Sequence, residues 1–429
     1  MSGIDAWQSE LPPAWSMRPL RSVAEYAVSN VDKILSDGEL PVRLCNYTDV
    51  YNNEKIHLGM EFMAGTATQS EISKFHLIAD DVVITKDSEA WDDIGIPALV
   101  TETADDFVCG YHLAMIRPDP EKLDGAFLFR CLQSKTVRVQ LELAANGITR
   151  FGIPKSAIGS LALPVPPTSI QRSIARFLDS ETADIDALIA AKQKLLDLMA
   201  EKRRAIVAEA IVRGLDPSAP LRPSGIDWLG DIPAHWEIER SRWLFTERDQ
   251  RSQTGEEEML TVSHLTGVTP RSEKDVNMFE AESTAGYKLC FAGDLAINTL
   301  WAWMGAMGTA RVDGIVSPAY NVYTPGPRLL PDYVDALVRI PVFAKEVTRY
   351  SKGVWSSRLR LYPEGFFETY WPVPPLGEQQ QIVAHITAET KKIDRLRVAT
   401  ENSIALLKER RSALIAAAVT GQLEIPEAA

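Results

Sequence analysis

The sequence predicts an α+β chain in which two similar α/β domains are joined by two long helices that form an antiparallel coiled coil. Three observations predict this fold. The segment Pro-Val-Pro-Pro at 164–167 recurs at 372–375, a proline-free stretch of helix-forming residues follows each copy, and the two segments that precede these copies contain similar elements in the same order. The chain is therefore interpreted as an internal tandem duplication.

The two long helices are predicted by a pattern that repeats at an offset of 208 residues, beginning with Gln171 and Gln379. Gly and Pro end both stretches, at Gly214 and at Gly421. Apolar residues at 3-4 spacing predict a coiled-coil seam. We expect this seam to include Ile185, Leu196, Met199, Ile206, Ile393, Ile404, Leu407 and Leu414. The alternative is two surface helices, each packed on its own domain, but helices of about 45 residues would span about 65 Å, long for one domain.

The duplication also predicts the domain boundaries. Trp7 and Trp15 are spaced like Trp228 and Trp236, so each unit begins with a Trp/Pro entry and ends with a long helix. We expect a first domain at 1–163, a first long helix at 164–213, a linker at 214–235, a second domain at 236–371, a second long helix at 372–421 and a C-terminal tail at 422–429.

Each domain is expected to contain short strands followed by a helical stretch and a glycine-containing loop. In the first domain these are strands at 42–50, 81–86 and 107–116, helix at 123–145 and a loop at 146–151. In the second they are strands at 259–266, 294–299 and 319–324, helix at 331–350 and a loop at 351–359. The order of elements is thus shared while the surface residues differ.

Composition and charge limit the classes of function. The net charge of −13 disfavours a non-specific nucleic-acid binder, because such binding depends on neutralising phosphates, but it leaves room for a localised basic site. No apolar run approaches the length that crosses a bilayer, and the amino terminus has no basic and apolar leader, so we expect neither secretion nor membrane contact. Four cysteines without CxxC or metal spacing are typical of a reducing compartment, and we expect a cytoplasmic protein.

The sequence contains none of the catalytic motifs that would identify an enzyme. It has no GxxxxGK[ST] loop, no HExxH, no glycine-rich dinucleotide fingerprint and no [DNS]PP[YFW] signature of an amino-methyltransferase. Its six histidines show no ligand spacing. We therefore expect a non-catalytic chain with no metal and no cofactor of its own.

Candidate binding residues occur in duplicate, at the end of each helical stretch and in the glycine loop that follows. The basic members are Lys135, Arg138, Arg150 and Lys155 in the first domain, and Arg349, Lys352, Arg358 and Arg360 in the second. Side chains suited to base edges or phosphates accompany them: Asn146, Thr149, Trp355, Ser356 and Ser357. The alternative is a solvated helix face with a loop packed on the proline segment. Duplication of the cluster within two acidic domains favours DNA contact.

A second candidate patch follows the first strong strand of each domain. It comprises Asn46, Tyr47 and Thr48 in one domain and Ser263 and His264 in the other, and an ordinary polar turn is the alternative. Trp301 and Trp303 are expected in the core rather than on a stacking surface.

Nearly the whole chain resembles the specificity subunit of type I restriction-modification systems. The resemblance rests on the duplicated Pro-Val-Pro-Pro segment with the Gln and Ile residues that follow it, and on Ala-Val-Thr-Gly-Gln-Leu at 418–423. It implies two target-recognition domains, each reading one half of a bipartite double-stranded DNA sequence, held apart by two antiparallel helices that set the spacer.

The resemblance also implies partners that carry the chemistry. Two modification subunits would dock on the two long helices, bind S-adenosylmethionine and methylate adenine. Restriction subunits would supply the ATP- and Mg-dependent translocase and nuclease. The alternative from another class is a non-DNA scaffold, with two binding modules on a coiled coil arranging protein partners. A single-chain restriction and methylation enzyme is the third, and would need a catalytic domain for which the sequence has no motif.

Overall fold

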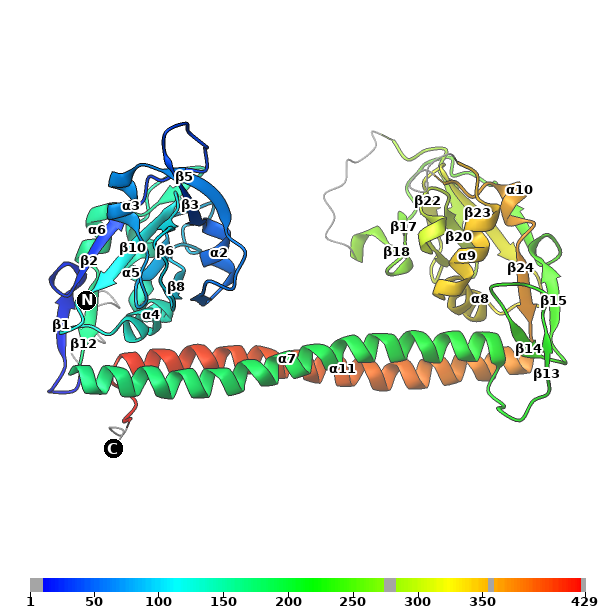
Figure 1. Cartoon of the computed structure of the whole chain (residues 1–429). Helices are drawn as coiled ribbons and strands as arrows, with labels where there is room; N and C mark the ends of the chain where they lie inside the picture. The colour runs from blue at the N-terminus through cyan, green and yellow to red at the C-terminus, as the bar shows by residue number, and fades with distance from the viewer. Residues whose placement is uncertain (1–10, 274–282, 354–358, 426–429) are drawn as a thin grey trace. The chain divides into compact units, whose positions relative to one another are not determined.

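The computed structural model describes residues 11–273, 283–353 and 359–425 (Figure 1). The chain divides into two compact units. Unit 1 combines residues up to Lys192 with those from Asn402 onward, and unit 2 comprises Gln193–Glu401. Both long helices therefore contribute one half to each unit.

The central sheet of unit 1 has five strands. Strands with consecutive apolar residues, such as Val82–Ile84, can be buried on both faces of such a sheet. Its order is β2 (Ala24–Val28), β10 (Leu113–Pro118), β6 (Val82–Thr85), β8 (Pro97–Val100) and β4 (Lys55–Ile56). The register aligns Ala114 with Ile84 and Val82 with Leu99, and only the β4–β8 pair is parallel.

Smaller elements surround this sheet. A second sheet has the order β5 (Met63–Ala67), β3 (Leu40–Cys45), β9 (Phe107–Cys109), and a ribbon joins β1 (Ser16–Pro19) to β12 (Ala162–Val165). The short strands β7 (Asp87–Ser88) and β11 (Phe151–Gly152) pair with each other. The remaining short helices are η1 (Leu20–Ser22), α2 (Tyr47–Asn52), α3 (Gln69–Phe75) and α6 (Lys155–Ser160).

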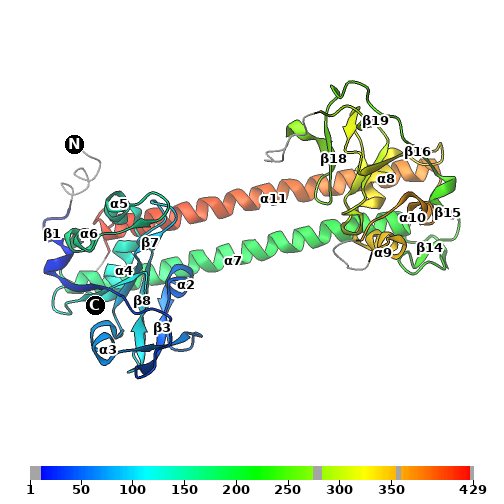
Figure 2. The same ribbon diagram turned by 90° about the horizontal axis from the view of Figure 1, so that it is seen from above.

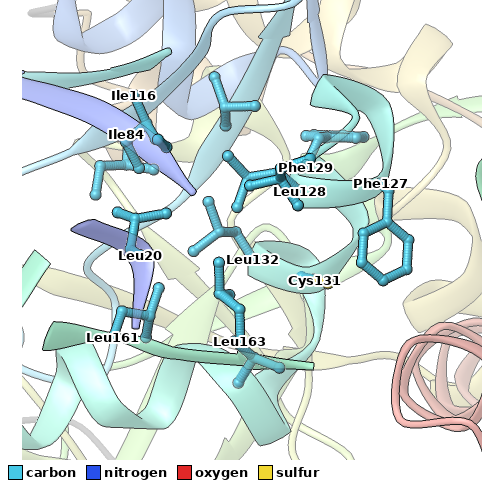
Figure 3. Close-up of a cluster of buried hydrophobic side chains, with 14 of the residues drawn as sticks. Leu20, Ile84, Ile116, Phe127, Leu128, Phe129, Cys131, Leu132, Leu161 and Leu163 are labelled. Carbon is cyan, nitrogen blue, oxygen red and sulfur yellow. The ribbon is translucent and has the colours of Figure 1, made fainter. Parts of the chain in front are cut away.

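Two helices, α4 (Gly125–Gln133) and α5 (Lys135–Ala144), cover one face of the central sheet and complete the core of unit 1. Figure 3 shows Leu128 and Leu132 of α4 pointing toward strand residues such as Ile84 and Ile116, while Phe127 points away from them on another side of α4; all of these residues are buried. The core is thus built by one apolar helix face packed on an apolar sheet face.

Unit 2 repeats this plan with a four-stranded central sheet. The order is β16 (Phe245–Arg248), β23 (Tyr320–Pro325), β20 (Leu295–Asn298) and β21 (Met307–Thr309), matching β2-β10-β6-β8 of unit 1 without a counterpart of β4 among the described residues. Its remaining strands form two-stranded pairs. These are β17 (Leu260–Ser263) with β18 (Gly267–Pro270), β19 (Lys288–Cys290) with β22 (Gly314–Val316), β15 (Glu237–Arg240) with β24 (Tyr370–Val373), and β13 (Leu221–Pro223) with β14 (Asp231–Pro233). The helices are η2 (Ser241–Trp243), η3 (Arg271–Glu273), η4 (Ala302–Met304), α8 (Pro331–Val338), α9 (Pro341–Tyr350) and α10 (Pro363–Phe366).

The long helices are α7 (Thr168–Arg213) and α11 (Leu376–Val419), each followed by a glycine with positive φ, as predicted. In unit 1 the start of α7 shares a core with the end of α11, through residues such as Leu178 and Ile415. In unit 2 the end of α7 packs with the start of α11, through Ile211 and Ile382. The pairing is therefore antiparallel within each unit (Figure 2), and the predicted fold class is confirmed.

A buried glutamine joins each long helix to its domain. Gln171 accepts a hydrogen bond from the backbone N–H of Asp124 (2.8 Å) and donates to the carbonyls of Lys122 (2.9 Å) and Pro166 (2.8 Å). Gln379 makes the same three kinds of bond in unit 2, with the backbone of residues 330, 328 and 374. Both side chains are fully buried, so the repeated Pro-Val-Pro-Pro-x-x-x-Gln pattern is a structural joint.

Several predicted elements are shorter than expected. The strand predicted at 42–50 ends at Cys45, because Asn46 begins helix α2 with a capping box. The strand at 107–116 is divided by a turn in which His112 has positive φ, and the one at 259–266 turns back after Ser263. Both predicted helical stretches are divided in two, the second before Pro341, whose ring cannot continue a helix.

Candidate nucleic-acid interface

Each predicted glycine loop is closed by a pair of backbone hydrogen bonds at its ends, and each is attached at the same place in its unit. In unit 1 the backbones of Asn146 and Gly152 exchange hydrogen bonds of 3.0 and 2.9 Å, and Lys352 and Arg360 exchange two of 2.9 Å in unit 2. The next residue of each hairpin then donates to the loop after the central strand, from Ile153 N to Lys86 O (2.9 Å) and from residue 361 to residue 299 (3.1 Å). We name residues 146–152, and in unit 2 the paired ends 352–353 and 359–360, the reading hairpins.

The two candidate patches of unit 1 come together beside the first reading hairpin. Tyr47, at the start of α2, lies near Ser88 of the hairpin's partner strand and near Arg150. Burial raises the pKa of the Tyr47 phenol, while a hydrogen bond with Ser88 and the nearby charge of Arg150 oppose that rise. The Tyr51 ring stacks on Tyr47 with centroids 5.6 Å apart. An aromatic pair, a hydroxyl and an arginine therefore share one surface.

A fixed carboxylate underlies this surface. Burial raises the pKa of Asp87, but hydrogen bonds from Lys86 (2.7 Å) and His112 (2.7 Å) outweigh burial and hold it below its ordinary value. These groups orient the strand to which the hairpin is paired. Asp87 thus serves as a support of the hairpin, because its oxygens are engaged within the unit.

The predicted side chains of unit 1 divide into free and engaged groups. Asn146, Thr149, Arg150 and Thr48 are exposed. Other predicted contacts already have partners: Asn46 caps α2, Lys135 and Arg138 face the buried Glu142 at 4.0 and 3.3 Å, and Lys155 lies over the Tyr26 ring at 5.7 Å. Arg138 is therefore engaged within the unit, whereas the hairpin, Thr48 of α2, Lys135 and Lys155 keep exposed side chains.

In unit 2 the two predicted patches are anchored separately. Ser263 and His264 form the β17–β18 turn, which is held by Arg339 at the end of α8 through the carbonyl of residue 265 (2.8 Å). Arg349, Lys352 and Arg360 are exposed at or beside the second reading hairpin, and the Arg349 guanidinium lies 5.6 Å from the Tyr350 ring. The predicted residues Trp355, Ser356, Ser357 and Arg358 lie outside the described residues.

Exposed tryptophans near the hairpins were not predicted as contacts. Trp301 is 49% exposed, so its expected place in the core is wrong, and it stacks on the half-buried Trp303 with centroids 6.5 Å apart. In unit 1, Trp91 is 48% exposed on the loop that follows the equivalent strand. Aligning the strands on each side of these loops would have revealed the shared position, although the two tryptophans lack a constant sequence offset.

The long helices bury part of the predicted seam and expose other apolar residues. Ile185, Ile393 and Ile404 are buried, whereas Leu196, Met199, Ile206, Leu407 and Leu414 are half-buried. The most exposed leucines come in matched pairs 208 residues apart, Leu188 with Leu396 and Leu198 with Leu406, between 46% and 65% exposed. The structure therefore places unpartnered apolar surface at equivalent positions of both helices, outside the stripe that the sequence predicted.

Neither a metal site nor a membrane span occurs in the described part of the chain. Within 11–273, 283–353 and 359–425, no group of three or more His, Cys, Asp or Glu side chains is placed to hold a metal ion. None of the helices in those ranges has the length and apolar character needed to span a bilayer.

Comparison with known proteins identifies relatives in sequence and in fold. Residues 14–197 match the family model described as "Type I restriction modification DNA specificity domain". Over 236 residues, 53% of this chain, the sequence is 23% identical to a type I restriction enzyme MjaX specificity subunit of Methanocaldococcus jannaschii. That match spans about half of the relative's length, 52%.

Solved structures share the fold at low identity. A chain from work on "complex assembly and conformational transition of the type I R-M system" has a TM-score of 0.71 at 18% identity, with 96% of this chain and 99% of that chain covered. The HsdS subunit from Thermoanaerobacter tengcongensis has a TM-score of 0.56 at 18% identity, with 96% and 98% covered. The resemblance stated from the sequence is thus confirmed.

Proposed function

From the premise that residues 14–197 belong to the type I restriction modification DNA specificity domain family, we propose that this chain is the sequence-reading subunit of such a system. Each unit reads one half of a bipartite double-stranded target. The long helices set the number of unread base pairs between the halves. The chain itself is non-catalytic and acts in the cytoplasm, where its four buried, unpaired cysteines remain thiols.

The observation that carries the proposal is the duplicated reading hairpin. A hairpin fixed at both ends, with exposed polar and basic side chains, can present hydrogen-bond donors to base edges at little entropic cost. In unit 1, Thr149 and Arg150 are exposed on such a hairpin beside Tyr47. Because the two hairpins dock alike yet differ in sequence and length, the two half-sites should differ in sequence.

The exposed leucine pairs support docking of two partner subunits. Unit 1 contains Leu188 and Leu406, and unit 2 contains Leu198 and Leu396, so each unit offers one leucine from each helix. Equivalent apolar surface in each unit suits two copies of one partner. We assign it to two modification subunits, which would bring S-adenosylmethionine, and further restriction subunits would bring the ATP- and Mg-dependent steps.

Genome-wide mapping of methylated adenines tests the assignment of half-sites. Strains would express the whole system with the native chain, with Thr149→Ala/Arg150→Ala, or with Lys352→Ala/Arg360→Ala. We expect the first double variant to relax one half-site and the second to relax the other. Each base that is no longer read should reduce discrimination by about 1–3 kcal/mol.

The control is Lys33→Ala/Lys74→Ala, which removes two exposed lysines from unit 1 outside its reading hairpin. It should leave the target unchanged. A methylation pattern that is independent of this gene, or a hairpin variant that alters both half-sites equally, would contradict the proposal and favour a scaffold without DNA contact.

A further inference from the structure

Unit 1 contains an ion-pair network, centred on the buried Arg130, between its domain and the long helices. Arg130 of α4 is 2% exposed and donates to Asp179 (2.6 Å) and to the Thr182 hydroxyl (3.1 Å), both on α7. Lys55 of β4 reaches the other oxygen of Asp179 at 2.9 Å. The network fills the space between the sheet edge and the helices.

Arg411 of α11 completes this network by binding two carboxylates. Its guanidinium lies 2.9 Å from Asp186 of α7 and 2.6 Å from Glu54, beside β4. The Asp186 contact joins the two long helices, while the Glu54 contact joins α11 to the domain. The N–H groups of the Arg411 guanidinium therefore donate to carboxylates along two of its edges.

Unit 2 retains only part of this arrangement. Gln171 bonds to residue 124, just before α4, and Gln379 bonds to residue 330, just before α8. Counted from these two residues, Arg130 matches Ala336. The helix offset of 208 matches Asp179 with Thr387 and Arg411 with Arg203. Arg203 keeps the helix contact, at 3.7 Å from Asp394, but the described residues of unit 2 include no counterpart of strand β4 and hence none of Glu54.

A cavity of about 470 Å³ occupies the vacated space in unit 2. Its lining includes Ala336, Thr387 and four arginines: Arg203, Arg204, Arg311 and Arg339. Arg339 contacts Asp335 at 3.7 Å, and Asp332 also lines the cavity. The cavity therefore lies where the carboxylates of unit 1 would be, and cations outnumber anions in its lining.

Two of these arginines have no ion-pair or hydrogen-bond partner among the described residues. They are Arg204 of α7 and Arg311, which follows β21, and both are exposed at the cavity. Two cations without a described protein partner at one cavity favour an anionic occupant. Val207 and Ile386 supply apolar lining, which strengthens an ion pair by limiting water.

We propose that this cavity receives an aspartate or glutamate side chain of a partner protein, in the place that Glu54 takes beside Arg411 in unit 1. The inference rests on the proposed function, which supplies the partner: a modification subunit docked on unit 2. The template within the same chain favours a carboxylate, since the matching arginine of unit 1 already binds one there. The two units would then hold their modification subunits differently, because unit 1 fills the site with its own residues.

The test uses the full-length chain and the modification subunit of the same system, purified without DNA, with association measured by sedimentation. Arg204→Ala/Arg311→Ala should weaken the affinity for one of the two modification subunits about ten-fold or more. Ala336→Arg/Thr387→Asp, which transfers the Arg130–Asp179 pair into unit 2, should have the same effect while the chain alone keeps its melting temperature. Arg251→Ala, an exposed arginine elsewhere in unit 2, should change nothing.

A photo-crosslinking residue at position 387 identifies the occupant directly. In the reconstituted complex it should label a modification-subunit peptide that contains Asp or Glu, and substitution of that acid should weaken assembly as the arginine variants do. Unchanged association in both double variants, or a labelled peptide without an acid, would overturn the inference. So would normal assembly with a smaller salt dependence of DNA binding, which would assign the cavity to a phosphate.

DNA binding by the assembled native complex is measured in parallel. A native complex that assembles but prefers no DNA sequence would refute the proposed function alone, and the effect of the arginine variants on assembly would still decide the cavity.

Discussion

Units 1 and 2 have the same arrangement of elements but different side chains where the domain meets the long helices. The sheet order, the glutamine joint and the docking of the reading hairpin are common to both. Unit 1 adds strand β4 and an ion-pair network around the buried Arg130, whereas unit 2 has a four-stranded sheet and an arginine-lined cavity. Duplication has thus preserved backbone joints that satisfy buried polar groups, while side chains at the domain–helix junction have diverged.

A buried aspartate just before an inner strand of each central sheet is a second joint that both units keep. Asp81 is fully buried and pairs with Arg117 of β10 at 2.7 Å. Its counterpart Asp294 is 2% exposed and pairs with Arg248, which lies on the outer strand β16. Both carboxylates also accept a backbone N–H three residues earlier, from residues 78 and 291. The turn has kept its aspartate, and the arginine has changed strands.

The largest expected effect concerns the shared joint. Gln171→Ala and Gln379→Ala each leave three backbone groups without a partner, so each should lower the unfolding free energy of its own unit by about 3 kcal/mol or more. Calorimetry of the full chain measures the shift. Gln380→Ala, an exposed neighbour, is the matched control and should cost under about 0.5 kcal/mol. Equal, small effects at positions 379 and 380 would refute the joint.

The next effect separates the units. Arg130→Ala removes the buried partner of Asp179 and should destabilise unit 1 by about 2–4 kcal/mol. Lys55→Ala breaks an exposed contact to the same carboxylate and should cost under about 1 kcal/mol. Chemical denaturation monitored by fluorescence distinguishes the two outcomes. If both variants cost the same, the network in unit 1 is no more than surface charge.

A smaller effect depends on pH. Gln140 bonds both backbone groups of Ala162, at 3.0 Å each, whereas its counterpart Glu346 accepts from Tyr370 N (3.0 Å) and, when ionised, has no proton to donate. Burial raises the pKa of Glu346, so the folded state holds the proton more tightly than the unfolded state. Its contribution to stability is therefore greatest below the unfolded pKa and is lost as the pH rises through the folded pKa.

Glu346→Gln should raise the unfolding free energy at neutral pH by about 1 kcal/mol and flatten its dependence on pH. Gln140→Glu in unit 1 should do the reverse. Melting temperatures between pH 4 and pH 8, taken as about the range in which a carboxyl with a raised pKa titrates, provide the measurement. A Glu346→Gln variant that is less stable than the native chain at neutral pH would show that the buried charge stabilises the fold.

The sequence predicted those features that repeat at a constant offset. Proline placement and the glycine stops predicted α7 and α11, and the match of Gln171 with Gln379 marked the joint. Local bonding decided what the pattern could not show: a capping box ends the strand at Cys45, and Pro341 divides a helix. In the site, the predicted DNA contact Arg150 is exposed, whereas Arg138 pairs with the buried Glu142. The spacing of residues 138 and 142 does not by itself show that Glu142 is buried. The cavity was invisible in the sequence because it arises from what unit 2 lacks.

The long helices provide the most direct test of the account. If they alone set the spacer, lengthening them should leave the sequence of both half-sites unchanged. Four residues would be inserted in α7 after Leu196 and four in α11 after Glu401, which keeps the Arg411–Asp186 and Arg203–Asp394 pairs in register. At about 1.5 Å per residue the insertion adds about 6 Å. At about 3.4 Å per base pair that is one or two base pairs.

Insertion in α7 alone is the control, and by displacing the paired faces it should impair assembly. Methylated adenines mapped in such a strain should show both half-sites unchanged and the spacer longer by one or two base pairs. Half-sites of altered sequence, or an active protein with the original spacer, would contradict the account.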